Sequence, residues 1–176
     1  MRRHFTVSGF LVEGDSTLLH WHKKLQIWLP PGGHIDPDED PVQAVVREVL
    51  EETGIAAEVV PHELEHAFSN LPQLPSPLSI IVADVGASAD EPTHQHIDMC
   101  YALRPLTGIA RTAPEAEHGF VLVSAEQLRR DEALPVASCG VDVPVAEDVR
   151  VLALRSIALV RGAGQTASLR PTTHNL

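Results

Sequence analysis

The sequence has few cysteines, and it has no long apolar run. Its two cysteines, Cys100 and Cys139, show no metal-type spacing and form no disulfide framework, so a reducing, cytoplasmic location is expected. No stretch approaches the roughly 20 apolar residues that a membrane-spanning helix needs, so no membrane contact is expected. Residues 1–15 start basic and turn apolar, but they lack the small-residue cleavage site of a signal peptide.

Basic residues are also scarce, because 13 Lys and Arg stand against 24 Asp and Glu, giving a formal net charge of -11. This balance argues against binding to a DNA or RNA duplex or to an anionic membrane. An acidic protein can still act on a phosphate substrate if divalent cations bridge the like charges. The 176 residues suit one domain. We expect it to cover 1–162, followed by a polar, disordered tail over 163–176.

Secondary-structure signals of both kinds occur along the chain. Helices are expected over about 41–53, from Ser124 onward, and over about 144–161. Strands mix with these helices throughout, which predicts an α/β or α+β class with a mixed sheet. The expected strands are 4–12, 17–22, 55–60, 78–85, 94–103 and 120–123, and the expected loops are 29–41, 69–77 and 108–119.

The segment 41–53 has the clearest helix boundaries. Asp40 suits the N-cap and Pro41 the first helical position, while Gln43 completes a capping box. Gly54 suits the C-terminal end. At 100° per residue the helix has an apolar face for the core, which is formed by Val42, Val46, Val49 and Leu50.

Another face of this helix carries three glutamates, Glu48, Glu51 and Glu52. Like charges at these spacings cost about a few tenths of a kcal/mol per pair. Arg47 can reach Glu51, but one arginine does not neutralise three acids. The helix alone leaves two explanations open: a solvated acidic face, or carboxylates that bind magnesium or manganese together with water and substrate phosphates.

The residues before the helix extend the pattern. From Gly33 the chain reads glycine, five residues, Glu39, seven residues, and then "REVLEETGI". This resembles the Nudix box of the Nudix, or MutT-type, hydrolase family. The pattern of that box is glycine-x5-glutamate-x7-arginine-glutamate-aliphatic-x-glutamate-glutamate-x-glycine-aliphatic, and this sequence matches it at every fixed position. The box covers 23 residues, and weaker resemblance extends to "WLPPGG" before it and "FVLVSAEQL" after it.

The resemblance implies an α/β/α sandwich with a mixed β-sheet. It also implies Mg²⁺-dependent hydrolysis, with Mn²⁺ as an alternative ion, of a pyrophosphate linkage in a nucleoside diphosphate derivative or a nucleoside triphosphate. A nucleotide-binding or regulatory module without catalysis is the alternative, but such proteins usually lose a box glutamate. Homodimers are common among similar proteins. By position, the metal ligands would be Glu51, Glu52, the assisting Glu48 and the Gly33 carbonyl, Arg47 would pair with Glu39, and Gly54 would close the helix.

Metal-bound water also needs a proton acceptor, and the box carboxylates are mostly occupied by metal. Similar proteins often take this general base from the loop before the strand that ends the sheet. Here that loop carries Glu115 and Glu117. Glu117 is preferred because it lies closer to the strand at Phe120. Glu63 and Glu65 remain alternatives.

Substrate contacts are expected from histidines and a tryptophan. The strand over 94–103 places His94, His96, Asp98 and Cys100 on one face. This pattern could form a zinc site, but spacing alone rarely proves one, and a polar strand face that lines a pocket is preferred. The expected substrate-contacting residues are His94, His96, His34 and Trp28, although core packing explains a tryptophan equally well.

Overall fold

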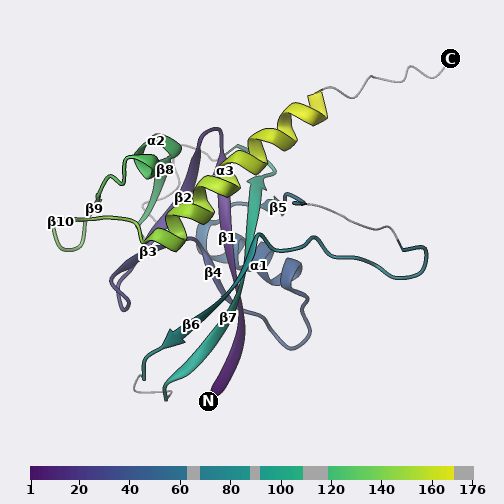
Figure 1. Cartoon of the computed structure of the whole chain (residues 1–176), viewed down its shortest axis with the longest axis horizontal. Helices are drawn as coiled ribbons and strands as arrows, with labels where there is room; N and C mark the ends of the chain where they lie inside the picture. Colours follow the sequence, from purple (N-terminus) through teal and green to yellow (C-terminus); the bar gives the residue numbers. More distant parts are fainter. Residues whose placement is uncertain (63–67, 88–91, 109–118, 169–176) are drawn as a thin grey trace.

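Two long strands, β1 (Arg2–Glu13) and β7 (His94–Pro105), run parallel in the middle of the sheet (Figure 1). The computed structural model describes residues 1–62, 68–87, 92–108 and 119–168. The sheet has eight strands in the order β3-β2-β1-β7-β5, while β4 pairs with β1, β6 with β7 and β8 with β2. The other strands are β2 (Ser16–His22), β3 (Ile27–Leu29), β4 (Gly32–His34), β5 (Ala57–Val59), β6 (Ser79–Val85) and β8 (Phe120–Ser124).

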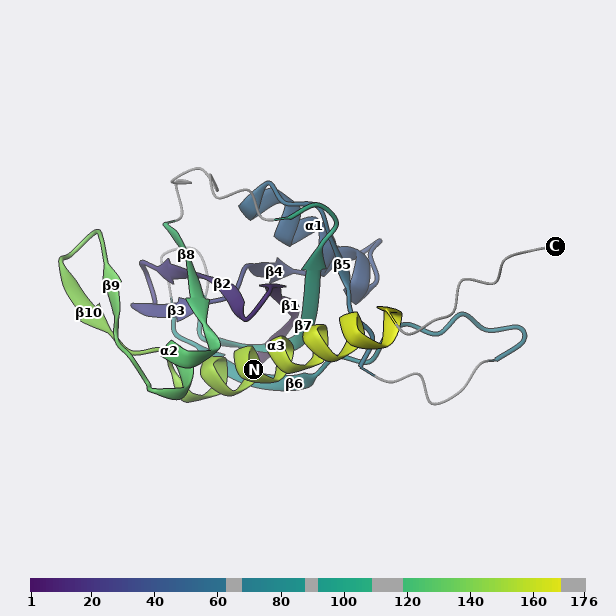
Figure 2. The same cartoon turned by 90° about the horizontal axis from the view of Figure 1, so that it is seen from above.

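Two helices cover opposite faces of this sheet. Figure 2 shows α1 (Pro41–Thr53) on one side of the central strands and α3 (Glu147–Ser168) on the other. Because side chains alternate along a strand, β1 contributes to both layers. Phe10 and Val12 belong to the core under α3, whereas Val7 and Leu11 belong to the core under α1. The predicted α/β/α sandwich with a mixed sheet is confirmed.

Helix α1 begins and ends as predicted. Asp40 is the N-cap with Gln43 completing the capping box, and Gly54 closes the helix at a φ of 71°. A Cβ on Gly9 of β1 would lie 2.7 Å from Val49, so the glycine lets the helix approach the sheet closely. The predicted apolar face was wrong in one respect, because Leu50 is 46% exposed. The residues that face the core are Ala44, Val45, Val49 and Thr53.

Several elements differ from the prediction. The expected loop over 29–41 contains β4, which is held by pairing with β1 although its Gly-Gly-His sequence has no strand signal. A short helix, α2 (Ala125–Arg129), follows Ser124 as expected, but the hairpin of β9 (Leu134–Val136) and β10 (Val141–Val143) was missed.

The end of the chain also corrects the predicted boundary. Helix α3 continues to Ser168 instead of ending near 161, because glycines lower helix stability without breaking a helix that is already formed. The predicted tail over 163–176 therefore overlaps this helix by six residues, and its remainder, 169–176, lies outside the described residues.

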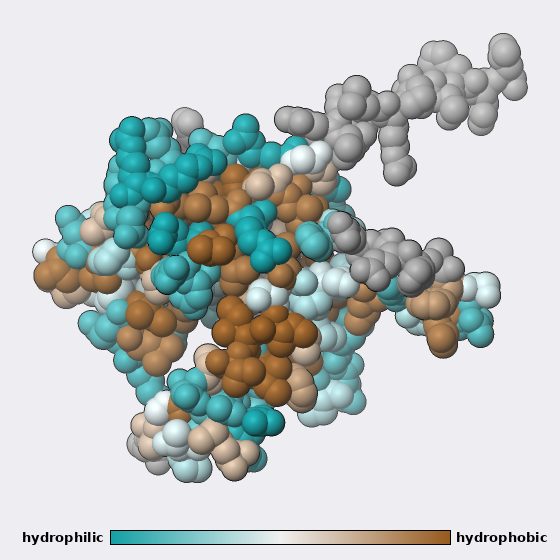
Figure 3. All heavy atoms as spheres, viewed as in Figure 1, coloured by the Kyte–Doolittle hydropathy of each residue, from teal (hydrophilic) through white to brown (hydrophobic). Residues whose placement is uncertain are grey.

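An exposed apolar area lies on β6, a strand at the edge of the sheet. Figure 3 shows apolar atoms gathered over β6, where Ile80 and Val82 are each 59% exposed. No helix in the described part of the chain is both long and apolar enough to cross a membrane.

Candidate active site

Arg47 is the centre of an ion-pair network on α1. Its Nε and Nη2 donate to the two carboxylate oxygens of Glu39 at 2.7 and 2.9 Å, so the expected pair is present. Its Nη1 donates to Glu48 at 2.9 Å and to Glu51 at 3.1 Å, and Nη2 also reaches the carbonyl oxygen of His34 at 3.1 Å. One guanidinium thus fixes the loop before the helix, two glutamates of the helix and strand β4.

These contacts shift the pKa of both partners in the central pair. The hydrogen bond from Arg47 lowers the pKa of the Glu39 carboxyl, burial opposes this shift, and the backbone N–H of Asp36 adds to the lowering. The hydrogen bonds to Glu39 and Glu48 raise the pKa of the Arg47 guanidinium. Both groups are therefore charged at neutral pH, and the pair links the box helix to its preceding loop.

The lowered pKa of Glu39 predicts a pH-dependent contribution to stability. A depressed carboxyl pKa stabilises the fold above the ordinary value of 4.5, and this stability is lost as the pH falls through the lowered pKa. We expect Glu39→Gln to melt at a lower temperature than the wild type near neutral pH. The difference should shrink toward about pH 3, as measured by thermal melting across the pH range.

Glu58→Gln is the matched control, because Glu58 pairs with Arg104 in an exposed position, with side chains 48% and 45% accessible. An exposed pair contributes little, so this variant should melt close to the wild type. If the difference in melting temperature between Glu39→Gln and the wild type stayed constant from neutral pH to about pH 3, the stabilising role of the ionised Glu39 carboxyl would be refuted.

Two glycines of β4 let the box carboxylates lie against the backbone. A Cβ on Gly33 would lie 2.4 Å from the Glu48 Oε1 atom, and a Cβ on Gly32 would lie 2.1 Å from the carbonyl oxygen of Val7. Side chains at these positions would push β4 away from α1 and β1. The N–H of Gly32 also donates to Glu52 Oε2 at 3.1 Å, so β4 positions two of the three glutamates.

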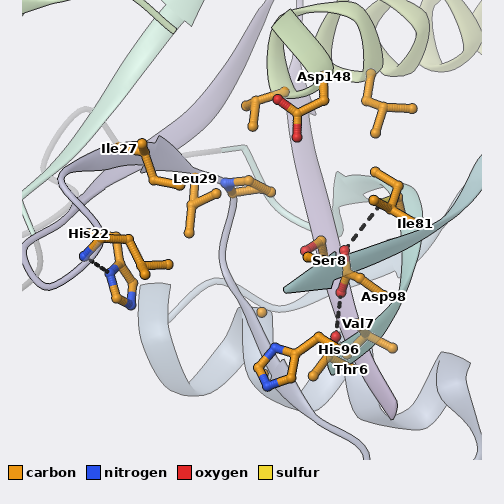
Figure 4. Close-up of a pocket in the computed structure, with 18 of the residues that line it drawn as sticks. Thr6, Val7, Ser8, His22, Ile27, Leu29, Ile81, His96, Asp98 and Asp148 are labelled. Carbon is orange, nitrogen blue, oxygen red and sulfur yellow. Dashed lines mark hydrogen bonds between the residues drawn. The ribbon is translucent and has the colours of Figure 1, made fainter. Parts of the chain in front are cut away.

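Glu52, Gly32 and Gly33 line a cavity of about 530 Å³. This volume is within the range of small-molecule sites. Figure 4 shows its walls, with Asp148 of α3 and His96 of β7 on opposite sides. The lining residues that the sequence did not suggest come from distant segments and carry no common motif; they include Thr6, Ser8, Ile27, Leu29, Ile81 and Asp148.

The expected substrate-contacting residues fall into two groups. His34 and His96 line the cavity. Trp28 is 1% exposed, packs edge-on against Trp21 and donates its Nε1–H to the Val143 carbonyl at 3.1 Å. His94 is 4% exposed. The assignment of Trp28 and His94 to substrate contact is therefore corrected, because neither has accessible surface for a ligand.

The polar face of β7 is arranged as the alternation predicted. Asp98 accepts from the Thr6 hydroxyl at 2.8 Å and from the Cys100 thiol at 3.2 Å. Burial raises the pKa of Cys100, and the Asp98 carboxylate raises it further, so the thiol stays protonated. Burial lowers the pKa of His96, and the neighbouring histidines lower it further. Asp98 therefore links β7 to β1 through Thr6 and also accepts from Cys100 on its own strand.

Glu115, Glu117, Glu63 and Glu65 all lie outside the residues that the structure describes. The preference for Glu117 therefore stays a prediction.

A sequence profile of the NUDIX domain matches residues 2–138, and the chain belongs to the NUDIX family. Hydrolases of this family generally use divalent metal ions. A solved hydrolase of the NUDIX family from Clostridium perfringens is 28% identical and superposes with a TM-score of 0.67 over 91% of this chain and 99% of its own.

Curated relatives match over shorter stretches of the chain. The asymmetrical bis(5'-nucleosyl)-tetraphosphatase of Rattus norvegicus is 53% identical over 56 residues, 32% of this chain and 38% of that protein. The m7GpppN-mRNA hydrolase NUDT17 of Danio rerio is 55% identical over 29 residues, 16% of this chain and 10% of that protein. The chain thus spans less than two thirds of the length of either relative.

Proposed function

We propose that this protein is a Mg²⁺-dependent pyrophosphohydrolase that cleaves a pyrophosphate linkage in a nucleoside diphosphate derivative or a nucleoside triphosphate. The observation that carries the proposal is the complete set of box carboxylates on α1: Glu48 beside Gly33, Glu51 bound by Arg47, and Glu52 lining the cavity. A binding module that had lost catalysis would have no need to keep all three. The names of the relatives support a nucleotide substrate.

The residues present fit a hard divalent cation. Glu48, Glu51, Glu52 and the Gly33 carbonyl offer oxygen donors, which Mg²⁺ and Mn²⁺ prefer. The network also carries excess negative charge, since Arg47 is one guanidinium among four box carboxylates. When bound, Mg²⁺ would neutralise phosphate oxygens and lower the pKa of a bound water.

The protein's own groups would prepare the site for this chemistry. Arg47 orients Glu48 and Glu51, and the Gly32 N–H orients Glu52, so the carboxylates need little reorganisation during the reaction. His34 and His96 face the cavity on the substrate side. Glu117 would accept the proton of the attacking water. Positioning and electrostatics account for most of the rate acceleration in this kind of reaction.

A substrate panel tests the proposal. Dinucleoside polyphosphates, nucleoside diphosphate sugars, capped nucleotides and nucleoside triphosphates would be incubated with the metal-free protein and with added Mg²⁺, and the products separated by chromatography. We expect at least one compound to be cleaved at a pyrophosphate linkage with Mg²⁺ and none with a chelator. Tight nucleotide binding without any cleavage would favour the regulatory module instead.

Kinetics of two loop variants test the general base. Glu117→Gln should lower kcat by about a hundredfold at saturating Mg²⁺ and remove the acidic limb of the pH–rate profile. Glu115→Gln is the matched control from the same loop and should keep the wild-type profile. Near-normal kcat with an unshifted acidic limb in Glu117→Gln would exclude Glu117, and unchanged kinetics in both variants would exclude the loop.

The compartment and assembly belong to the proposal as well. Cys100 is buried and Cys139 is exposed, and both are free thiols, which supports a reducing cytoplasm. The expected homodimer stays a prediction.

A further inference from the structure

Four imidazoles from three strands lie together, and two of them, His34 and His96, line the cavity. His4 of β1 lies beside His96 of β7 in the parallel pair, and His34 of β4 joins them because it lies opposite Thr6 in the antiparallel pair. The ring centroids of His4 and His34 are 5.3 Å apart, those of His34 and His96 are 5.0 Å apart, and those of His4 and His96 are 6.0 Å apart. Three rings therefore form a triangle, and the fourth, His94, lies 5.0 Å from His96.

The ring nitrogens of His4, His34 and His96 converge. One nitrogen from each ring lies within 4.8 Å of the other two. Among the residues that the structure describes, these three histidines form the group of His, Cys, Asp or Glu side chains whose ligand atoms converge in this way. His4 Nδ1 and His34 Nε2 are 3.2 Å apart. Two nitrogens bound to one tetrahedral zinc ion at 2.0–2.1 Å would be about 3.4 Å apart. This pair, which is also within hydrogen-bond distance, is close to the spacing of two ligands, and a nitrogen of His96 lies within 4.8 Å of both.

His94 orients His96 through a hydrogen-bonded chain. Its Nδ1 is 2.9 Å from the Pro92 carbonyl oxygen, which can only accept, so Nδ1 is the donor. In the neutral ring Nε2 must then be the acceptor, and its partner at 3.1 Å, His96 Nε2, must donate. The lone pair of His96 is thereby placed on Nδ1. Metal-binding histidines typically show such a partner on the nitrogen that does not bind the ion.

The donor chemistry selects the kind of ion. Three imidazoles without a carboxylate suit Zn²⁺ and the neighbouring transition metals, whereas Mg²⁺ prefers oxygen ligands. Asp98 is not part of this group of converging ligand atoms, and its carboxylate accepts from Thr6 and Cys100. The three glutamates of the Arg47 network lie close by, since Arg47 also contacts the His34 carbonyl. Their excess negative charge would favour a second cation without providing its ligands.

We propose that His4, His34 and His96 bind a Zn²⁺-type transition-metal ion at a site distinct from the carboxylate site of α1. His94 is the positioning residue for His96. Because His34 and His96 also line the cavity, a remaining ligand position of the ion is available to a substrate oxygen, so the two histidines would reach the substrate through the ion. That last step rests on the proposed function, whereas metal binding by the three histidines does not.

The test measures metal binding and not activity. The full-length protein would be stripped with a chelator and titrated with Zn²⁺ by calorimetry, and Co²⁺ would report tetrahedral coordination through its visible absorption. We expect one equivalent of Zn²⁺ bound to the histidines. His4→Gln and His96→Ala should each weaken this binding by about tenfold or more, and His94→Ala should weaken it by about 10–100-fold at an unchanged fold by circular dichroism.

Two variants serve as controls. His62→Ala removes an exposed histidine outside the cluster and should bind Zn²⁺ like the wild type. Glu52→Gln alters the carboxylate site and should also keep the equivalent of Zn²⁺. The proposal is overturned if folded wild-type protein binds no stoichiometric Zn²⁺, if the histidine variants bind it normally, or if Glu52→Gln alone abolishes binding. Loss of hydrolysis with Zn²⁺ binding intact would contradict the proposed function and leave this site standing.

Discussion

Glu52→Gln should lower kcat by at least a hundredfold, about 2.7 kcal/mol in the barrier, while the protein stays folded. Glu52 lines the cavity and accepts a hydrogen bond from the Gly32 N–H at 3.1 Å. Glutamine has the same shape and its amide oxygen can still accept from Gly32, so β4 should keep its position. What the variant loses is the negative charge that a divalent cation requires. Steady-state kinetics at saturating Mg²⁺, beside a thermal melt, measure both effects.

Glu58→Gln is the appropriate control for this variant too. It removes one carboxylate from β5, where Glu58 pairs with Arg104 away from α1. The change in net charge is therefore the same as in Glu52→Gln. Its kcat should match the wild type. Activity of Glu52→Gln within about threefold of the wild type would refute the role of Glu52, because a lost metal ligand costs far more than that.

Arg47→Ala should reduce both the rate and the stability. The guanidinium donates to three glutamates and to the His34 carbonyl, and its side chain is only 26% exposed. Removing it leaves adjacent carboxylates without their shared partner. We expect kcat to fall by about a hundredfold, since small displacements of positioning groups can have effects of this size. The melting temperature should fall by several degrees.

Arg47→Lys separates charge from geometry. Lysine keeps the positive charge but cannot donate to both oxygens of Glu39 while also reaching Glu48. We expect an intermediate melting temperature and a rate closer to that of Arg47→Ala. Wild-type rate and melting temperature in Arg47→Ala would show that the network has no part in catalysis or stability.

The box helix was predictable because its signals are local. The capping residues, the closing glycine and the spacing of Arg47 from Glu39 are all set within one stretch of chain, and the structure shows each contact. The helix wheel was less reliable about burial. It placed Leu50 in the core, whereas the contact with Gly9 of β1 turns Val45 and Val49 inward.

Strand β4 and the cavity were not predictable, because they depend on pairing between distant segments. Gly32 and Gly33 have no intrinsic strand preference, and only β1 beside them makes the segment extended. The cavity takes its walls from strands β1, β2, β3, β4, β6 and β7 and from helices α1 and α3, and its lining residues share no single sequence pattern. Trp28 illustrates the same limit, since its burial follows from packing against Trp21 and the Val143 carbonyl.

The sequence by itself determined the family, the acidic helix face and the alternation of β7, because residue identity and short spacing are sufficient for these. Only the tertiary structure decided which histidines meet. On β7 the sequence grouped His94 and His96 with Asp98. In the structure, the register of β1 and β4 brings His4 and His34 to His96. Asp98 instead accepts hydrogen bonds from Thr6 and Cys100. The physical reason is that strand pairing places residues side by side across 92 positions of the chain, and no local pattern records that register.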